Sequence, residues 1–131
     1  MACLDSDLLV SFLRRQPDAL AAMNRLESEE GTLCTTIVTV CELFEGASFA
    51  SEAVRASRAL ESLLSRMSVI DLDLDSARIF GQIRCDLRRT GRLLDDMDML
   101  IASIALAHGE TLITRNGKHF GRVPGLKIQT W

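Results

Sequence analysis

The chain has 131 residues, a formal net charge of -3 at pH 7 and an apolar content of 47%. This length suits one domain with a substantial core, and the acidic balance argues against a continuous basic coat for nucleic acid. No apolar run reaches membrane-spanning length and no signal peptide is recognisable, so we expect a cytoplasmic protein without membrane contact.

The cysteines and histidines do not form a metal-binding pattern. There is no CxxC pair, and His108 and His119 lack the spacing of zinc ligands. We therefore expect the cysteines to be reduced and to act as small buried hydrophobic residues. They are Cys3, Cys34, Cys41 and Cys85.

The start of the chain predicts a strand followed by helices. An apolar stretch at Ala2–Leu4 predicts a first strand, which ends at Asp5. Ser6 or Asp7 can cap the helix that follows, and a second helix is predicted over residues 18–29.

The middle of the chain continues this alternation. Residues 32–36 predict a second strand and residues 37–47 a helix that is broken near Gly46. The β-branched residues at the start of that helix would also suit a continued strand. An amphipathic helix is predicted over residues 52–66 and a third strand over residues 68–72.

The last part of the chain predicts two helices and two strands. Asp75 is the predicted cap of a helix over residues 76–90. The apolar run at residues 100–107 suits a buried helix, and strands are predicted over residues 111–114 and 126–129.

Strands that alternate with helices predict a single α/β domain, with a mostly parallel central sheet of about five short strands flanked by helices. In such sheets, ligands bind beyond the carboxyl ends of the strands. Asp5, Glu42, Asp98 and Asn116 all lie just after a strand or in the first turns of a neighbouring helix. We expect them to converge at that edge.

Carboxylates that converge repel one another, by about 4 kcal/mol per pair at about 4 Å and an effective dielectric near 20. A marginally stable fold keeps such a cluster only if protons or a cation relieve it. Oxygen ligands favour Mg²⁺ or Mn²⁺, and such an ion can activate water for attack on phosphorus. The cluster therefore predicts metal-assisted phosphodiester hydrolysis.

For any single acid, a helix cap explains the spacing better than a metal ligand does. Asp95 is predicted to be a cap of this kind. Asp71, Asp73 and Asp75 alternate like the start of a calcium loop, but the glycine and the final glutamate of that loop are missing. His119 is predicted to be an exposed loop residue.

Three stretches carry a family resemblance: CLDSDLLVSFLR, TIVTVCELFEGA and DMDMLIASIALAHGETLITRNGKHFGRVPGLKIQTW. In this order and spacing, they resemble the PIN-domain ribonucleases, and specifically the VapC-type toxins of toxin–antitoxin pairs. The resemblance covers nearly the whole chain. It implies a PIN-like fold and a metal-dependent endoribonuclease toxin of a type II pair, in which a metal-activated water hydrolyses RNA.

The resemblance also implies roles for particular residues. Asp5, Glu42 and Asp98 match the family's metal-binding and catalytic acids, with Mg²⁺ or Mn²⁺ as the cofactor. Supporting roles fall on Asp96, Thr114 and Asn116.

Two positions depart from the family pattern. Asp7 stands where relatives often carry Asn, and its added charge acts near the site or merely as a cap. Asn116 replaces a fourth acid of some members, so one ion is as compatible with the site as two.

The resemblance further implies a homodimer and a cognate VapB-type antitoxin, whose C-terminal segment covers the active-site groove. From charge alone, we expect four cationic residues to bind the RNA backbone. They are Arg84, Arg88, Arg115 and Lys118.

Two other functions stay open from the residues alone. A haloacid-dehalogenase-like phosphatase would use Asp5 as nucleophile and Asp7 as acid, although no lysine is suitably placed. A non-catalytic binding module would use the acids only as caps and surface charges.

Overall fold

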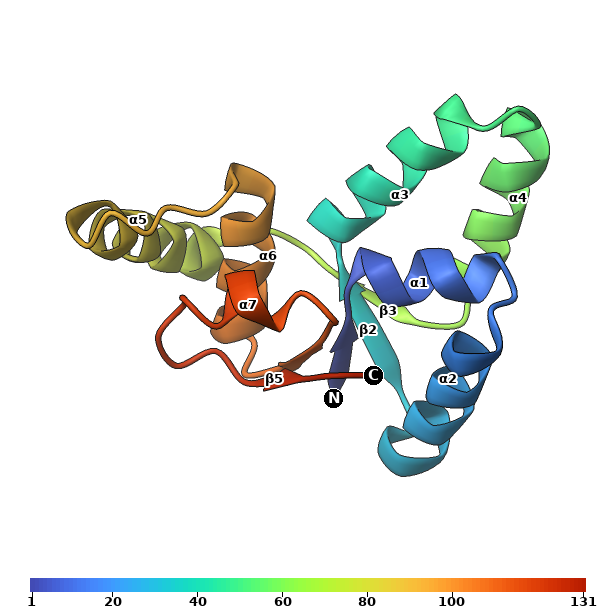
Figure 1. The fold of residues 1–131 in the computed structure, drawn as a ribbon, viewed down its shortest axis with the longest axis horizontal. Coiled ribbons are helices and arrows are strands. Elements are labelled where there is room, and N and C mark those ends of the chain that lie inside the picture. Colours follow the sequence, from blue (N-terminus) through green and yellow to red (C-terminus); the bar gives the residue numbers. More distant parts are fainter.

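The computed structural model describes residues 1–131 and contains a five-stranded sheet in the order β3-β2-β1-β4-β5. Every neighbouring pair of strands is parallel, as the alternation of strands and helices predicts (Figure 1). The strands are β1 (Ala2–Leu4), β2 (Leu33–Thr36), β3 (Ser68–Ile70), β4 (Thr111–Ile113) and β5 (Ile128–Gln129).

The helices lie on both sides of this sheet, with α1, α2 and α4 on one side and α5 and α6 on the other (Figure 1). They are α1 (Ser6–Leu13), α2 (Pro17–Glu30), α3 (Ile37–Phe49), α4 (Ala53–Leu64), α5 (Leu74–Arg89), α6 (Asp96–Ala107) and α7 (Gly117–Phe120). None of them is long and apolar enough to span a bilayer. The α/β architecture expected from the sequence is confirmed.

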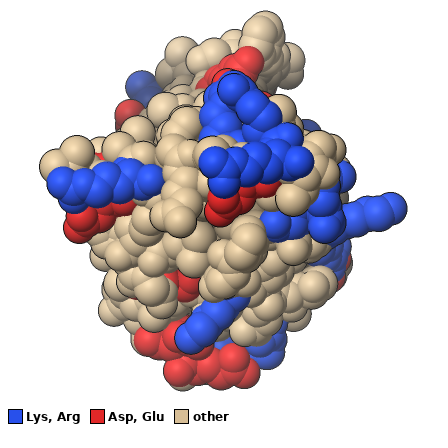
Figure 2. All heavy atoms as spheres, turned by 90° about the vertical axis from the view of Figure 1, so that its left-hand side faces the viewer, with Lys and Arg blue, Asp and Glu red and all other residues tan.

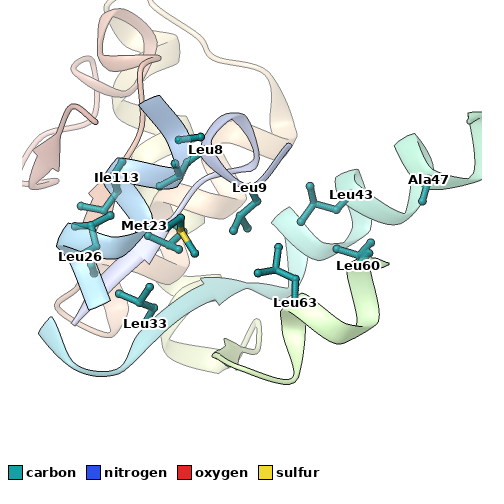
Figure 3. Close-up of a cluster of buried hydrophobic side chains, with 14 residues drawn as sticks. Leu8, Leu9, Met23, Leu26, Leu33, Leu43, Ala47, Leu60, Leu63 and Ile113 are labelled. Atoms are coloured by element: carbon teal, nitrogen blue, oxygen red, sulfur yellow. The ribbon is translucent and has the colours of Figure 1, made fainter. Parts of the chain in front are cut away.

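The sheet separates two hydrophobic clusters because neighbouring strand residues point to opposite faces. In β1, Ala2 and Leu4 belong to a cluster of 14 buried residues that includes side chains of α1, α2 and α4 (Figure 3). Cys3 belongs to a second cluster, of 13 buried residues, with side chains of α5 and α6. Since a fully buried Leu or Ile contributes about 1.5–3 kcal/mol, the two clusters hold both helical layers to the sheet.

Two helix caps differ from those predicted. Only Asp5 separates β1 from helix α1, so Asp5 is the N-cap of this helix, in place of Ser6 or Asp7. Helix α5 is capped by Asp73, whose Oδ1 accepts a hydrogen bond from the backbone N–H of Ser76 at 2.8 Å, so the predicted cap Asp75 lies in the first turn. In both cases the helix begins earlier than its apolar face, which set the predicted boundary.

Helix α3 resolves the ambiguity of its β-branched start. Thr36 ends β2 and caps α3, accepting the backbone N–H of Thr39 at 3.0 Å. A capped first turn makes residues 37–40 helical despite their β propensity. The helix also passes through Gly46, where a break was predicted, and ends at Phe49.

Further differences concern short or exposed features. Helix α7 has only four residues, too few to show a helical period, and it was not predicted. The last strand is shorter than expected. Cys3 and Cys34 are buried, as predicted. Cys41 and Cys85 were also predicted to be buried but are exposed, because they lie on outer faces of α3 and α5.

The strand register determines which side chains meet at the carboxyl edge of the sheet. Leu4 of β1 is paired with Ile113 of β4, so the next residues, Asp5 and Thr114, emerge side by side. The backbone N–H of Asp5 donates to the carbonyl of Ile113 at 3.1 Å. Helices α3 and α6 begin near the same edge and contribute the remaining acids.

Candidate active site

Asp5 lies at the centre of the carboxyl edge and is only 5% exposed. Its Oδ1 accepts the backbone N–H of Ser6 at 2.8 Å and its Oδ2 accepts the Thr114 hydroxyl at 2.7 Å. Burial raises the pKa of Asp5 to about 6, although both hydrogen bonds act in the opposite direction; the charges of Asp7 and Asp98 raise it further. A carboxylate in this state gains from a nearby cation.

Glu42 projects from α3 into the same region. Its Oε1 is buried and has no hydrogen-bond partner. Burial raises the pKa of Glu42 to about 7, with added repulsion from Asp5, Asp98 and Asp95. An unpartnered buried carboxylate oxygen is rare in folded proteins, and it leaves Glu42 able to contact a ligand or to carry a proton.

Asp98 lies in the first turn of α6, about half-buried. Burial raises its pKa, and the charge of Asp95 raises it further, whereas His119 lowers it. For each of the three acids predicted as catalytic, the charge of at least one other acid therefore disfavours the ionised form. They come from three separate elements.

Asp95 and Asp96 lie differently from the sequence prediction. Asp95 occupies the N-cap position of α6, but its side chain makes no capping hydrogen bond. Its charge instead acts on Glu42 and Asp98. The side chain of Asp96 is exposed and lies 2.7 Å from Arg84 Nη1, so it has an ion pair of its own. The sequence signal for Asp95 is that it directly precedes the helix that carries Asp98.

Thr114 and Asn116 complete the edge. Thr114 is fully buried and its hydroxyl contacts Asp5. The backbone N–H of Asn116 donates to Thr114 Oγ1 at 3.0 Å, while the Asn116 side chain makes no capping bond at the start of α7. The amide of Asn116 is thus free to contact a ligand.

The donor set fits a hard divalent cation. No three acidic, cysteine or histidine side chains lie close enough together to form a direct three-ligand site. Mg²⁺, however, is commonly bound by one or two carboxylates and several waters. Raised carboxylate pKa values, the unpartnered Oε1 of Glu42 and the absence of soft ligands all agree with such an ion.

Of the four cationic residues expected to bind RNA, two form ion pairs within the chain and two do not. Arg84 pairs with Asp96, and Arg115 pairs with Asp18 at 2.8 Å, so their charges are offset within the chain. Arg88 and Lys118 are exposed and make no ion pair. Figure 2 shows separate Lys and Arg side chains interspersed with acids on the side of the molecule that carries α5, in agreement with the low net charge.

Asp7 does not point into the acidic cluster as a free acid. Both its oxygens accept hydrogen bonds: Oδ1 from Trp131 Nε1 at 3.1 Å, and Oδ2 from the Arg115 backbone N–H at 2.7 Å. A phosphatase acid would need a free oxygen facing its substrate. The phosphatase hypothesis, with Asp5 as nucleophile and Asp7 as acid, therefore has no structural support.

A groove of about 460 Å³ adjoins the acidic cluster, and Glu42 is one of its lining residues. It lies between α1, α3 and α4. Its lining is largely apolar and small, with charged groups from Arg14, Glu52 and Arg55. Such a groove suits an apolar segment of another chain with a polar end directed at the acids.

Comparison with known proteins agrees with this arrangement. Residues 2–126 match the sequence profile of the PIN domain family. The chain is 30% identical to Ribonuclease VapC2 of Haemophilus influenzae over 128 residues, which cover 98% of this chain and 96% of that protein. It is 32% identical, with the same coverage, to a protein of Shigella flexneri named tRNA(fMet)-specific endonuclease VapC.

Solved structures give the same result. The fold matches a chain in the structure of VapBC2 from Rickettsia felis bound to a promoter DNA fragment, with a TM-score of 0.91 and 28% identity. The match covers 99% of this chain and 98% of that one. A chain in the structure of VapBC-1 from nontypeable Haemophilus influenzae matches with a TM-score of 0.88 and 27% identity, covering 99% and 97% of the two chains.

Proposed function

Because this chain belongs to the PIN domain family and, within it, to the VapC ribonucleases of toxin–antitoxin pairs, we propose that its acidic cluster hydrolyses RNA. The observation that carries the proposal is the convergence of Asp5, Glu42 and Asp98, whose pKa values are all raised. We propose that the protein acts in the cytoplasm, where RNA is accessible.

Asp5, Glu42 and Asp98 would hold Mg²⁺ or Mn²⁺ together with bound waters, since the three carboxylates do not lie close enough to contact one ion directly. When bound, such an ion lowers the pKa of water and stabilises the charge that develops on phosphate oxygens. Asp5 is already oriented for this role, because Ser6 and Thr114 each fix one of its oxygens. The repulsion among the carboxylates favours binding of the ion over the empty site.

Glu42 is suited to proton transfer as well. Its Oε1 has no hydrogen-bond partner in the chain, so it can accept a hydrogen bond from a water on the ion. We propose that this oxygen orients the attacking water and accepts its proton.

The RNA backbone would be held by the cations that have no partner in the chain. Lys118 lies two residues after Asn116, and Arg88 lies near the end of α5. Phosphate contacts from such residues give affinity and register without reading sequence. Initiator transfer RNA is the first substrate to test, because one relative is named for it.

The partner would be a VapB-type antitoxin, since the matching solved structures are of VapBC complexes. We propose that an apolar antitoxin segment occupies the groove between α1, α3 and α4 and ends next to Glu42. Such a segment would block RNA access to the acids. A homodimer of this chain is proposed on the family resemblance.

The test is cleavage of a labelled transfer RNA by the Asp5→Asn and Asp98→Asn variants in Mn²⁺ or Mg²⁺. Each should lose at least about a hundredfold in rate, since each removes a charged ligand. Asp75→Asn is the matched control, because Asp75 is an exposed acid paired only with Arg78. It should cleave at the wild-type rate.

Undiminished cleavage by both site variants would refute the assignment. A non-catalytic binding module predicts, in addition, that Mn²⁺ does not change the thermal stability of the wild-type protein. A phosphatase predicts hydrolysis of a phosphate monoester that depends on Asp5.

A further inference from the structure

Asp7 connects three segments that are distant in sequence. Its Oδ1 accepts hydrogen bonds from the Leu8 backbone N–H at 2.7 Å and from Trp131 Nε1 at 3.1 Å. Its Oδ2 accepts the Arg115 backbone N–H at 2.7 Å and lies 3.3 Å from the Thr114 hydroxyl. The carboxylate therefore joins the β1–α1 turn, the β4–α7 turn and the end of the sequence after β5.

The Arg115 side chain reinforces the same junction. Its guanidinium lies 3.5 Å from the centroid of the Trp131 ring, and its Nε donates to the Trp131 carbonyl at 3.0 Å. Its Nη2 pairs with Asp18 in the first turn of α2 at 2.8 Å. Stacking and the hydrogen bond to its carbonyl thus hold Trp131 in the position from which it reaches Asp7, while the pair with Asp18 holds the Arg115 side chain.

Thr114 links this junction to the acidic cluster. Its oxygen accepts the Asn116 backbone N–H at 3.0 Å, so its single proton is available for one carboxylate. The two candidates are Asp5 Oδ2 at 2.7 Å and Asp7 Oδ2 at 3.3 Å. Because the contact with Asp5 is the shorter of the two, the Thr114 hydroxyl donates to Asp5.

We propose that Asp7 is a positioning residue: it fastens the Thr114 turn against the β1–α1 turn and thereby orients Asp5 for the ion. The inference rests on the proposed function, in which Asp5 is a metal ligand. It assigns Asp7 a role other than helix capping or added charge. Hydrogen bonds to an ionised carboxylate are strong enough to hold such a turn, and small displacements of a ligand reduce activity.

The first test variant is Asp7→Ala, which removes both acceptor oxygens, whereas Asn, the residue that relatives often carry here, would keep one of them. We expect Mn²⁺ to bind about tenfold more weakly by calorimetry, which corresponds to about 1.4 kcal/mol. The kcat for RNA cleavage should fall while the KM stays near the wild-type value, because Asp7 does not contact RNA in this proposal. Circular dichroism would verify that the variant is folded at the assay temperature.

A double-mutant cycle with Thr114→Val separates positioning from charge. If Asp7 acts through Thr114, Asp7→Ala has little additional effect on Mn²⁺ affinity in the Thr114→Val background. If Asp7 acts only by its charge, the two effects multiply. Trp131→Phe is the complementary variant: it keeps the ring and the charge of Asp7 but removes the Nε1 donor, and it should weaken Mn²⁺ binding several-fold.

The outcomes are distinct. Wild-type Mn²⁺ affinity in both Asp7→Ala and Trp131→Phe, or multiplying effects in the cycle, would overturn the positioning role and leave the ribonuclease proposal intact. A wild-type protein that neither binds Mn²⁺ nor cleaves RNA would overturn both. Asp75→Asn serves again as the control for loss of a surface carboxylate.

Discussion

Asp5 and Glu42 are acids whose ionised forms the fold disfavours, and this has a consequence for stability. In the folded protein burial raises the pKa of Asp5 from 3.8 to about 6 and that of Glu42 from 4.5 to about 7. The folded state therefore keeps protons that the unfolded state has already released in this range. Without a divalent ion, the free energy of unfolding should be larger at low pH and should decrease as pH rises from about 4 to about 7.

The prediction is a loss of stability on the order of 2–3 kcal/mol between about pH 5 and about pH 8 in the presence of a chelator. Urea denaturation at the two pH values measures it. Adding Mn²⁺ should restore stability at the higher pH and have little effect at the lower one, where protons compete with the ion.

The Asp5→Asn variant is the control, because it cannot ionise at this position. It should be less sensitive to pH than the wild-type protein and, without the ion, more stable at about pH 8. A wild-type stability that rises steadily over the same range would contradict the raised pKa values.

At the scale of single elements, α3 depends on the cap that begins it. Thr36 is fully buried, and its hydroxyl serves both the Thr39 N–H at 3.0 Å and the Thr39 hydroxyl at 2.9 Å. This cap selects helix over strand for a segment rich in β-branched residues, and the resulting helix directs Glu42 to the acidic cluster. A local polar contact thus decides the position of an acid that we propose to be catalytic.

Replacing Thr36 by Val keeps the shape and removes the hydroxyl. We expect a loss of about 1–3 kcal/mol in the free energy of unfolding, because a capping bond is lost and a buried N–H is left without its partner. The measurement is urea denaturation, with Thr32→Val as the control, since Thr32 is exposed and caps no helix.

The control variant should change stability by less than about 0.5 kcal/mol. Equal stabilities of the two variants would mean that packing of α3, and not its cap, determines the helix.

At the scale of the whole molecule, the groove between α1, α3 and α4, where we propose that the antitoxin binds, is lined in part by Glu42 of the acidic cluster. Ala59 lies on α4, is exposed and lines the groove. Ala59→Glu should weaken antitoxin binding at least about tenfold, because a charge would be buried against an apolar segment without a partner. Ala21→Glu, on an exposed position of α2 outside the groove, is the matched control.

Titration of each variant with the antitoxin, with RNA cleavage as the readout, measures the change. The Ala59→Glu protein should require more antitoxin for the same inhibition than Ala21→Glu or the wild-type protein. Inhibition of Ala59→Glu at the wild-type antitoxin concentration would place the partner elsewhere on the molecule.

The amino-acid sequence alone determined the alternation of strands and helices, and with it the parallel sheet and the edge where ligands bind. It also identified Asp5, Glu42 and Asp98 as candidates, because each follows a strand or lies in the first turns of a helix next to that edge. These inferences depend on local periodicity and on a general rule of parallel sheets. Both are properties of short stretches of chain.

Only the tertiary structure decided which neighbouring side chains lie at the acidic cluster and which make hydrogen bonds or ion pairs within the chain. Asp7 meets Arg115 and Trp131 across 108 and 124 positions of sequence, and Arg84 meets Asp96 through the packing of α5 on α6. Which acid faces the cluster and which cation stays free depends on how the helices are oriented on the sheet. No local pattern encodes that, because it follows from the packing of whole elements.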